Sequence, residues 1–270
     1  MEQIASIEQI RSLIAQIRDR RQGFVTNFYL DEEKHNWWIR KGLFFYACLP
    51  HTLFLVKQSP DFWNVFYCST TKDELGEDVR AFQQTYPDKK WMVDIVGREH
   101  QCVPMIEMFE NQGFCMAASL VRMFRANPPA PSEELVDAVV KASANEAGMV
   151  SSLLAQYFDA TLEQLPLEEE LMDYAQNGQV LLCRIGKQIA GFLIFEQNMS
   201  TLYLRYWFTH PDFRDQGVGS KLLRAFFSEG KNAPRQLLWV IKHNENAIKR
   251  YRHYGFMEEN MLDFVMTNKL

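Results

Sequence analysis

The sequence predicts a mixed α/β fold of the α+β class, with two domains of similar size in tandem. Strand-like apolar runs alternate with helix-like segments along the 270 residues. The only proline-dense stretch lies near the middle and suits a linker, because proline removes backbone donors and favours extended geometry. We therefore expect domains at 1–126 and 132–270, joined by a linker at 127–131.

In the first half, three successive apolar runs predict strands, and a helix and a further strand follow. The strands are expected at 44–49, 52–57, 63–68 and 90–96, and the helix at 74–86. The segment 105–114 comes next and ends in Gly-Phe.

The second half begins with helical patterns and continues with alternating strands and helices. Helices are expected at 132–140, 151–157 and 167–175, and strands at 179–184, 189–195, 201–209, 236–242 and 261–266. Gly186 marks a hairpin turn between the first two of these strands. Two further helices are expected, one ending near residue 229 and one containing Tyr251.

A glycine loop, residues 214–220, joins the strand at 201–209 to an amphipathic helix. A strand that turns through glycines into a helix leaves backbone N–H groups free at the positive end of the helix dipole, which attracts phosphate. The order Gly219-Ser220-Lys221 does not fit a Walker loop, and the third glycine of the dinucleotide fingerprint is missing.

The loop and a second, downstream motif resemble the GCN5-related N-acetyltransferase (GNAT) superfamily. The acyl-CoA motif Arg/Gln-x-x-Gly-x-Gly/Ala is matched by Arg214, Gly217 and Gly219. The pattern Asn-x-x-Ala-x-x-x-Tyr-x-x-x-Gly-Phe is matched from Asn244 through Tyr251 to Phe256. The resemblance covers residues ~145–270 and implies, for each domain, a central twisted, mostly antiparallel sheet flanked by helices.

The resemblance also implies acetyl-CoA as cosubstrate and assigns residues to it. Main-chain groups of the strand would pair with the pantetheine arm, the loop would bind the diphosphate, and Asn244 would contact the arm or cap its helix. Tyr251 would give a proton to the departing thiolate, while Tyr254 is expected to be a packing residue. The strand and loop residues concerned are Trp207, Phe208, Thr209, Arg214, Asp215, Gln216, Gly217, Val218, Gly219 and Ser220. The basic stretch 249–253 either meets the adenosine 3′-phosphate or is surface charge.

The acceptor side is less clearly marked in the sequence. Some GNAT enzymes place a glutamate where this chain has Tyr203. Strand alternation would put Tyr203, Arg205, Trp207 and Thr209 on one face, so Tyr203 and Arg205 are candidate substrate-binding residues. Arg205 would pair either with an acceptor carboxylate or with Glu196 or Asp263. Glu196 and His243 are candidate bases, and a water relay needs neither.

The N-terminal half repeats part of the second motif at a constant offset. Phe109 stands at the position of Tyr251 and Cys102 at that of Asn244, while Gly113-Phe114 matches Gly255-Phe256. The glycine loop has no counterpart. We interpret residues 1–126 as a degenerate GNAT-like copy without a cofactor loop; an unrelated αβ domain with a coincidental Gly-Phe is the alternative.

Composition favours a cytoplasmic protein. The net charge of −5 argues against nucleic-acid binding, and no apolar run reaches the ~20 residues of a membrane span. The five cysteines lack Cys-x-x-Cys spacing, so neither a disulfide frame nor a metal site is expected.

We expect an N-acyltransferase that moves an acetyl group from acetyl-CoA to a primary amine of a small-molecule or amino-acid-like acceptor. The acceptor is expected near the interface of the two halves. Two alternatives remain. One is a non-catalytic acyl-CoA-binding regulator, and the other is a tandem GNAT-fold transferase that uses aminoacyl-tRNA.

Overall fold

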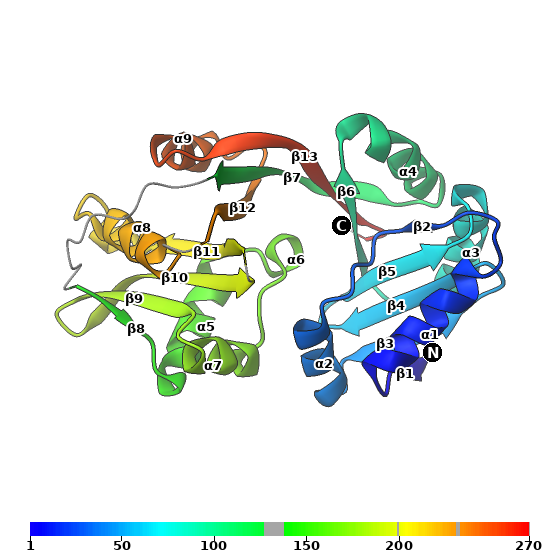
Figure 1. Ribbon diagram of the computed structural model, residues 1–270, viewed down its shortest axis with the longest axis horizontal. Coiled ribbons are helices and arrows are strands. Elements are labelled where there is room, and N and C mark those ends of the chain that lie inside the picture. Colours follow the sequence, from blue (N-terminus) through cyan, green and yellow to red (C-terminus); the bar gives the residue numbers. More distant parts are fainter. Residues whose placement is uncertain (127–137, 199, 231–232, 270) are drawn as a thin grey trace. The chain divides into compact units, whose positions relative to one another are not determined.

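The computed structural model describes residues 1–126, 138–198, 200–230 and 233–269 (Figure 1). The predicted linker at 127–131 lies outside the described residues. Residues 132–137 of the helix expected at 132–140 also lie outside the described residues. The prediction of a helix is wrong for the end of this segment, because Val139–Lys141 form a strand that pairs with Cys183–Leu181. The mixed α/β class is confirmed.

Contacts divide the chain into two compact units. Unit 1 comprises Met1–Leu120 with Asn260–Leu270, and unit 2 comprises Val121–Glu259. The limits differ from those expected from the proline-rich stretch, because two long strands pass from one unit into the other. These are β7 (Cys115–Ala126) and β13 (Met257–Thr267). Local sequence patterns predict a strand but not the unit in which it pairs.

Unit 1 is built on a sheet of order β1-β3-β4-β5-β6-β13, with β2 paired to β5. Its other elements are β1 (Glu2–Gln3), α1 (Ile7–Arg18), β2 (Val25–Thr26), α2 (Glu32–Arg40), β3 (Phe44–Cys48), β4 (Thr52–Gln58), β5 (Trp63–Ser69), α3 (Lys72–Thr85), β6 (Trp91–Gly97) and α4 (Glu99–Asn111). The strands predicted at 44–49, 52–57, 63–68 and 90–96 are confirmed within a residue or two. Pairing is antiparallel except between β5 and β6.

Unit 2 is built on a sheet of order β7-β12-β11-β10-β9-β8. Its other elements are β8 (Val139–Lys141), α5 (Ala147–Tyr157), α6 (Ala160–Glu163), α7 (Glu168–Gln176), β9 (Val180–Ile185), β10 (Gln188–Asn198), β11 (Thr201–Thr209), α8 (Val218–Glu229), β12 (Arg235–Ile241) and α9 (Glu245–His253), with short 3-10 turns at Ala144–Glu146 and Pro211–Phe213. Strands β11 and β12 are parallel, and β8 to β11 are antiparallel neighbours.

Helices cover both faces of the unit 2 sheet (Figure 1). Buried residues of α5 and α7 pack with alternate residues of the sheet, among them Phe192, Ile194, Tyr206 and Phe208. On the other face α8 approaches β10 so closely that a Cβ on Gly191 would meet Val218 Cγ1 at 2.7 Å. The apolar alternation of the strands therefore builds two cores, one on each side of the sheet.

A β-bulge at Arg205 changes which side chains of β11 share a face. The pairing of β10 with β11 passes from Ile194–Tyr206 to Phe195–Leu204, so Arg205 has no partner position on β10. The extra residue reverses the alternation along the strand. Tyr206 consequently joins the core beneath α5 and α7, while Trp207 faces α8.

The parallel pairing of β11 with β12 is short. It runs from Thr201–Arg235 to Leu204–Leu238 and ends at the bulge. Residues Tyr206–Thr209 continue to pair with β10 on their other side. The end of β11 therefore presents one edge of its main chain away from β10, next to the start of α8.

No helix among the described residues is long and apolar enough to cross a membrane.

Candidate functional site

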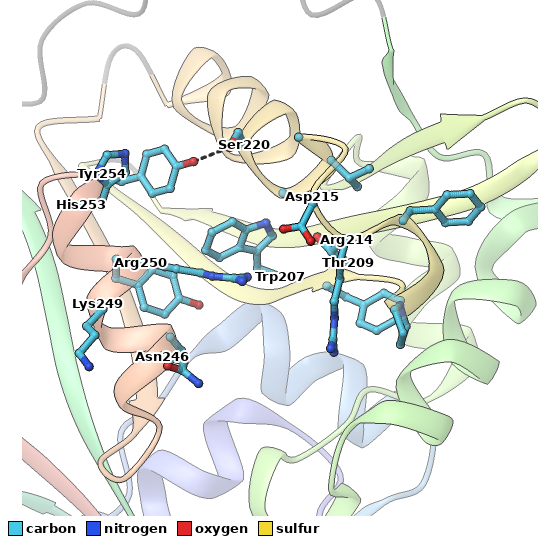
Figure 2. Close-up of a pocket in the computed structure, with 18 of the residues that line it drawn as sticks. Trp207, Thr209, Arg214, Asp215, Ser220, Asn246, Lys249, Arg250, His253 and Tyr254 are labelled. Carbon is cyan, nitrogen blue, oxygen red and sulfur yellow. Dashed lines mark hydrogen bonds between the residues drawn. The ribbon is translucent and has the colours of Figure 1, made fainter.

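A pocket of about 820 Å³ lies in unit 2 where the end of β11, the glycine loop, the start of α8 and one side of α9 meet (Figure 2). The end of α5 closes another side through Tyr157 and Phe158. Every cofactor residue predicted from the sequence lines this pocket except Gln216, whose side chain donates to Asp212 O at 3.4 Å instead.

The first turn of α8 offers free backbone donors to the pocket. The helix begins at Val218, and its N-cap, Gly217, has no side chain to accept from these donors. The first intrahelical bond is Lys221 N to Gly217 O at 3.0 Å, so the N–H groups of Val218, Gly219 and Ser220 have no intrahelical acceptor. No acidic residue stands in this turn. The helix start is therefore suited to an anion.

The two glycines of the loop are needed for different reasons. Gly217 has φ 73°, a left-handed conformation, and a Cβ there would meet nothing within 4 Å. Gly219 lies inside the helix, where a Cβ would come within 3.1 Å of Trp207 Cζ2 and 3.2 Å of Thr209 Oγ1. The sequence interpretation gave both glycines the same task of admitting phosphate. In the structure, Gly219 instead lets α8 pack directly on β11.

Trp207 forms the floor of the pocket between α8 and α9. Its ring centroid lies 5.5 Å from that of Tyr251 and 6.1 Å from that of Tyr254. The indole Nε1 is buried and has no hydrogen-bond partner among the described residues. A buried donor without a partner is costly, so this N–H is suited to an acceptor from a ligand.

Helix α9 supplies Asn244 and Tyr251 to the site. Asn244 lines the pocket and caps the helix, with its Oδ1 accepting from Ala247 N at 3.1 Å. Tyr251 also lines the pocket and is 8% exposed. Burial raises the pKa of its hydroxyl well above the ordinary value, and the negative charge of Glu163 raises it further. The phenol therefore stays protonated and can act as a proton donor.

Several residues that line the pocket had been assigned to packing or to surface charge in the sequence analysis. Tyr254, expected as a packing residue, lines the pocket and shares a hydrogen bond of 2.7 Å with Ser220 Oγ. Lys249, Arg250 and His253, for which surface charge was an open alternative, also line it. Figure 2 shows Arg250 extending from α9 across the pocket. Arg250 adjoins Tyr251 in the sequence, and Tyr254 follows it by three residues, about one helical turn. This spacing, on a helix already assigned to the cofactor, could have predicted that both residues line the pocket.

Arg205 and Tyr203 do not line the pocket. Arg205 Nε lies 3.6 Å from Glu196 Oε1, and its guanidinium stacks 5.2 Å from the Tyr203 ring centroid. Glu196 also accepts from the Tyr174 hydroxyl at 2.6 Å. Of the alternatives for Arg205, the structure shows the ion pair with Glu196. The prediction that Arg205 and Trp207 share a face is wrong, because the bulge at Arg205 interrupts the alternation.

Glu163, at the end of α6, is a residue that the sequence interpretation missed. Burial raises the pKa of its carboxyl to about 7, and the neighbouring Asp159 contributes to the shift. A short polar segment in the sequence gives no hint of this environment, which depends on the packing of α6.

Among the described residues, no group of three or more His, Cys, Asp or Glu side chains is arranged to hold a metal ion.

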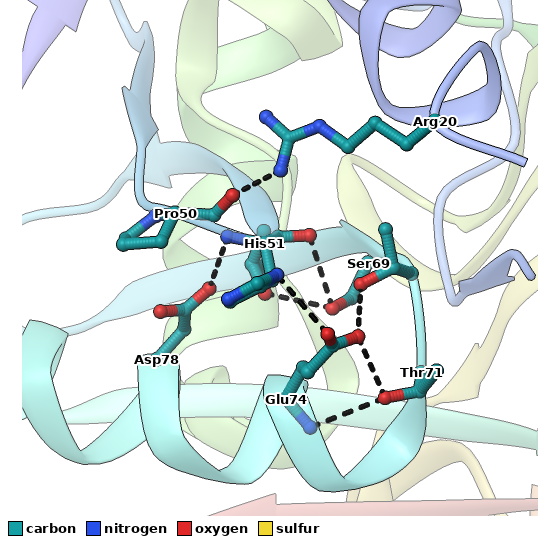
Figure 3. A network of polar contacts seen from close by, with 9 residues as sticks. Arg20, Pro50, His51, Ser69, Thr71, Glu74 and Asp78 are labelled. Atoms are coloured by element: carbon teal, nitrogen blue, oxygen red, sulfur yellow. Dashed lines mark hydrogen bonds and ion pairs between the residues drawn. The ribbon is translucent and has the colours of Figure 1, made fainter. Parts of the chain in front are cut away.

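The corresponding helix start in unit 1 is closed (Figure 3). Helix α3 follows β5 after only Thr70 and Thr71, and Thr71 caps it by accepting from Glu74 N at 3.3 Å. The Glu74 carboxylate accepts in turn from the hydroxyls of Thr70 and Thr71. His51 Nδ1 lies 3.2 Å from Glu74 Oε1. A side-chain cap and an acidic first turn leave little room or charge for an anion.

Comparison with known proteins agrees with this geometry. A sequence model described as the acetyltransferase (GNAT) family matches residues 147–256, a range that contains every residue lining the pocket. Residues 147–256 of the chain thus match the GNAT acetyltransferase family. Members of this family generally use acetyl-CoA.

A curated relative is an uncharacterized N-acetyltransferase of Methanocaldococcus jannaschii, 27% identical over 101 residues. The match covers 34% of this chain and 44% of the relative, so the chain spans less than half the length of that protein.

Solved structures show the same fold over most of the chain. A GCN5-related N-acetyltransferase from Sphaerobacter thermophilus has a TM-score of 0.59 at 13% identity and covers 87% of this chain and 84% of its own. A GNAT-family acetyltransferase from Colwellia psychrerythraea has a TM-score of 0.56 at 12% identity, covering 98% and 97%. A tandem GNAT protein from the clavulanic acid biosynthesis pathway has a TM-score of 0.53 at 11% identity, covering 80% and 78%. At these identities the likeness concerns the fold alone.

Proposed function

We propose that unit 2 transfers the acetyl group of acetyl-CoA to a primary amine of a small-molecule or amino-acid-like acceptor. The amine would attack the thioester directly while both substrates are bound. One observation carries the proposal: a single pocket joins the open start of α8, the free edge of β11 and the hydroxyl of Tyr251.

The phosphates of the cosubstrate would lie at the start of α8. The free N–H groups of Val218, Gly219 and Ser220 and the positive end of the helix dipole suit the diphosphate. Arg214, Lys249 and Arg250 line the same pocket and add positive charge. They favour a ligand with more than one phosphate group.

The pantetheine arm would follow the free edge of β11. Trp207, Phe208 and Thr209 line the pocket beyond the point where the pairing with β12 ends. Their main-chain groups can therefore pair with the amides of the arm as a neighbouring strand would. An N–H at this edge would also polarise the thioester carbonyl and stabilise the negative charge that develops on its oxygen.

Tyr251 would protonate the sulfur as the carbon–sulfur bond breaks. Its raised pKa keeps the hydroxyl protonated, and Tyr251 lines the pocket beside Trp207. Arg205 is not part of this proposal, because its guanidinium is engaged with Glu196.

Calorimetric titration of acetyl-CoA into three forms of the protein tests the proposal. G217E places a carboxylate at the start of α8. G186E makes the same change at another left-handed glycine of unit 2, with φ 60° and open space around its Cβ, in the turn between β9 and β10. Both variants carry similar backbone strain, but only G217E repels a diphosphate at the helix start.

We expect wild type and G186E to bind acetyl-CoA equally and G217E to bind at least about tenfold more weakly, a loss of about 1.4 kcal/mol. Equal binding by all three forms would place the cosubstrate elsewhere. A folded wild type that binds no acetyl-CoA would contradict the proposal. Binding without amine-dependent thiol release across a panel of primary amines would support a non-catalytic acyl-CoA-binding protein instead.

A further inference from the structure

We propose that the amine accepted by unit 2 carries an aromatic ring, which binds an aromatic wall formed by Tyr157, Phe158 and Phe208. This inference rests on the proposed function and narrows the acceptor from primary amines in general to aromatic ones. Three features of the wall support it: its place beside β11, the fixed position of its rings and its lack of charge.

The wall lies on the opposite face of β11 from the cosubstrate residues of α8 and α9. The Phe208 side chain belongs to the core beneath α5 and α7. Trp207 and Thr209 instead face α8, where a Cβ on Gly219 would come within 3.2 Å of each of them. The pocket therefore reaches both faces of the strand. The phosphate groups and Tyr251 belong to the side of α8 and α9, so the wall is left to the other substrate.

The wall is close to the place where the thioester would lie. Phe208 directly follows Trp207 on β11, and consecutive Cα atoms are about 3.8 Å apart. The main-chain groups of both residues are among those that the proposed function assigns to the pantetheine arm. The Phe158 ring centroid lies 5.7 Å from that of Tyr206 and 6.1 Å from that of Phe208, beside the same stretch of strand. A ring bound against the wall can therefore bring an amine on a short side chain to the thioester carbon.

Contacts within unit 2 hold the wall in a fixed position. The Tyr157 ring centroid lies 4.8 Å from that of Phe208, within the range that aromatic pairs prefer. The Tyr157 hydroxyl lies 3.3 Å from His210 Nε2. His210 Nδ1 accepts from Asp212 N at 3.3 Å, so the neutral imidazole carries its proton on Nε2 and donates to the tyrosine oxygen. Tyr157 is thus held at its ring and at its hydroxyl, which lowers the entropy cost of binding a ligand ring.

The wall is uncharged and keeps aromatic surface open to the pocket. Tyr157 is 37% exposed, and Phe158 is partly exposed. The basic residues that line the pocket come instead from the glycine loop and from α9. These are Arg214, Lys249, Arg250 and His253. An uncharged aromatic wall binds an apolar ring better than a carboxylate or a phosphate, because a charge taken out of water needs a partner.

Steady-state kinetics with three primary amines test the inference. Phenethylamine carries an aromatic ring, cyclohexylethylamine a saturated ring of similar size, and propylamine no ring. Acetyl-CoA is supplied at a saturating concentration, and thiol release is followed in wild type, Y157L, Y157F and Y29L. Tyr29 is 77% exposed, belongs to unit 1 and does not line the pocket, so Y29L is the matched control.

We expect wild type to show a kcat/KM for phenethylamine about 10²-fold above that for propylamine, because the ring leaves water for an aromatic surface. It should also exceed that for cyclohexylethylamine by about threefold, since only an aromatic ring gains from stacking geometry. Y157L should lower the preference for phenethylamine over propylamine by about tenfold. Y157F keeps the ring and should retain the preference, and Y29L should match wild type.

The outcomes separate this inference from the function on which it rests. If wild type acetylates all three amines with equal kcat/KM, or if Y157L keeps the full preference, the wall does not bind the acceptor ring and the proposed function stands. Calorimetric titration that finds acetyl-CoA bound about tenfold more weakly by Y157L would assign the wall to the cosubstrate and overturn the inference. If wild type binds acetyl-CoA but acetylates none of the amines, the proposed function is contradicted and this inference with it.

Discussion

Both units contain a succession of strand, helix, strand and helix, which is β5-α3-β6-α4 in unit 1 and β11-α8-β12-α9 in unit 2. The first helix of this succession begins in opposite ways in the two units. In unit 2 the loop at 210–217 ends in an uncapped helix whose first N–H groups face a pocket. In unit 1 two threonines lead directly into α3, where the Thr71 hydroxyl accepts from Glu74 N and the first turn carries the acidic residues Asp73 and Glu74. The length and chemistry of one loop thus decide whether the helix start is open or capped.

A second difference lies beside the same strands. In unit 1 the parallel pairing of β5 with β6 covers only Trp63–Asn64 and Trp91–Met92. Beyond it the side chain of Asn27 accepts from Tyr67 N at 2.7 Å and donates to Asp94 O at 3.1 Å, and β2 pairs with the end of β5. The chain itself thus fills the opening that unit 2 leaves beside β11. In unit 1, β2 and Asn27 therefore lie along the part of β5 that β6 does not cover.

The largest expected effect comes from exchanging phenylalanine and tyrosine at positions 251 and 109, which correspond in the repeated motif. Y251F removes the proton donor and should lower kcat by about 10²-fold while acetyl-CoA binds as before. F109Y makes the reverse change in unit 1, where Phe109 is 1% exposed and packs on Phe114. An added hydroxyl there has no ready partner and should cost about 1–3 kcal/mol of stability without changing kcat.

Thiol-release kinetics and urea unfolding of both variants check this pair. A Y251F enzyme with wild-type kcat would exclude the phenol as the acid. An F109Y protein with altered kcat but unchanged stability would mean that unit 1 takes part in the reaction.

The next largest effect is expected from replacing glycine by alanine near the start of α8 and near the start of α3. G219A pushes a Cβ against the Trp207 ring and Thr209, at 3.1 and 3.2 Å, and should destabilise the protein by about 1–3 kcal/mol and weaken acetyl-CoA binding. In α3 a Cβ on Gly76 would meet Cγ of the flexible Met108 side chain at 3.3 Å. G76A should therefore be neutral or stabilising by up to about 1 kcal/mol, because alanine favours helix. Equal unfolding midpoints for the two variants in urea would show that α8 does not pack on Trp207 as described.

The cap of α3 gives a smaller effect. T71A removes the acceptor of Glu74 N and should cost about 1 kcal/mol of the free energy of unfolding. Helix α8 has no side-chain cap, so G217A gives no loss of this kind and acts only through its positive φ and through ligand affinity. Denaturant unfolding of T71A that matches wild type would show that the threonine cap contributes nothing, and the comparison between helix starts would then rest on charge alone.

The smallest effect is a difference in pH dependence between Glu74 and Glu163. Hydrogen bonds from Thr70 and Thr71 lower the pKa of Glu74, so its contribution to stability is present above pH 4.5 and is lost as the pH falls through its folded-state pKa. Burial raises the pKa of Glu163, so stability falls as the pH rises from 4.5 through about 7. E74Q should flatten the acid side of the stability curve and E163Q the neutral side, measured by urea unfolding across pH. The same slope change in both variants would contradict the opposite environments of the two carboxyls.

The residue patterns in the sequence predicted those features that depend on short-range spacing. The strand at 201–209, the glycine loop and the helix carrying Tyr251 all follow from short-range spacing, and the structure has them where the sequence placed them. The bulge at Arg205 did not follow, because it arises from the register of β11 against β10. Glu163 was missed for a similar reason, since its pKa depends on burial that only the packed fold creates.

The passage of β13 from unit 2 into unit 1 has a genetic consequence. A stop codon at position 260 would leave the sequence of unit 2 whole and remove the strand that pairs with β6 through Leu262–Thr267. The lesion would fall after the last residue of unit 2, yet it would unfold unit 1. Loss of the last residues should therefore produce a protein that the ribosome completes and the cell's quality control degrades, and supplying residues 257–270 as a separate peptide should rescue it.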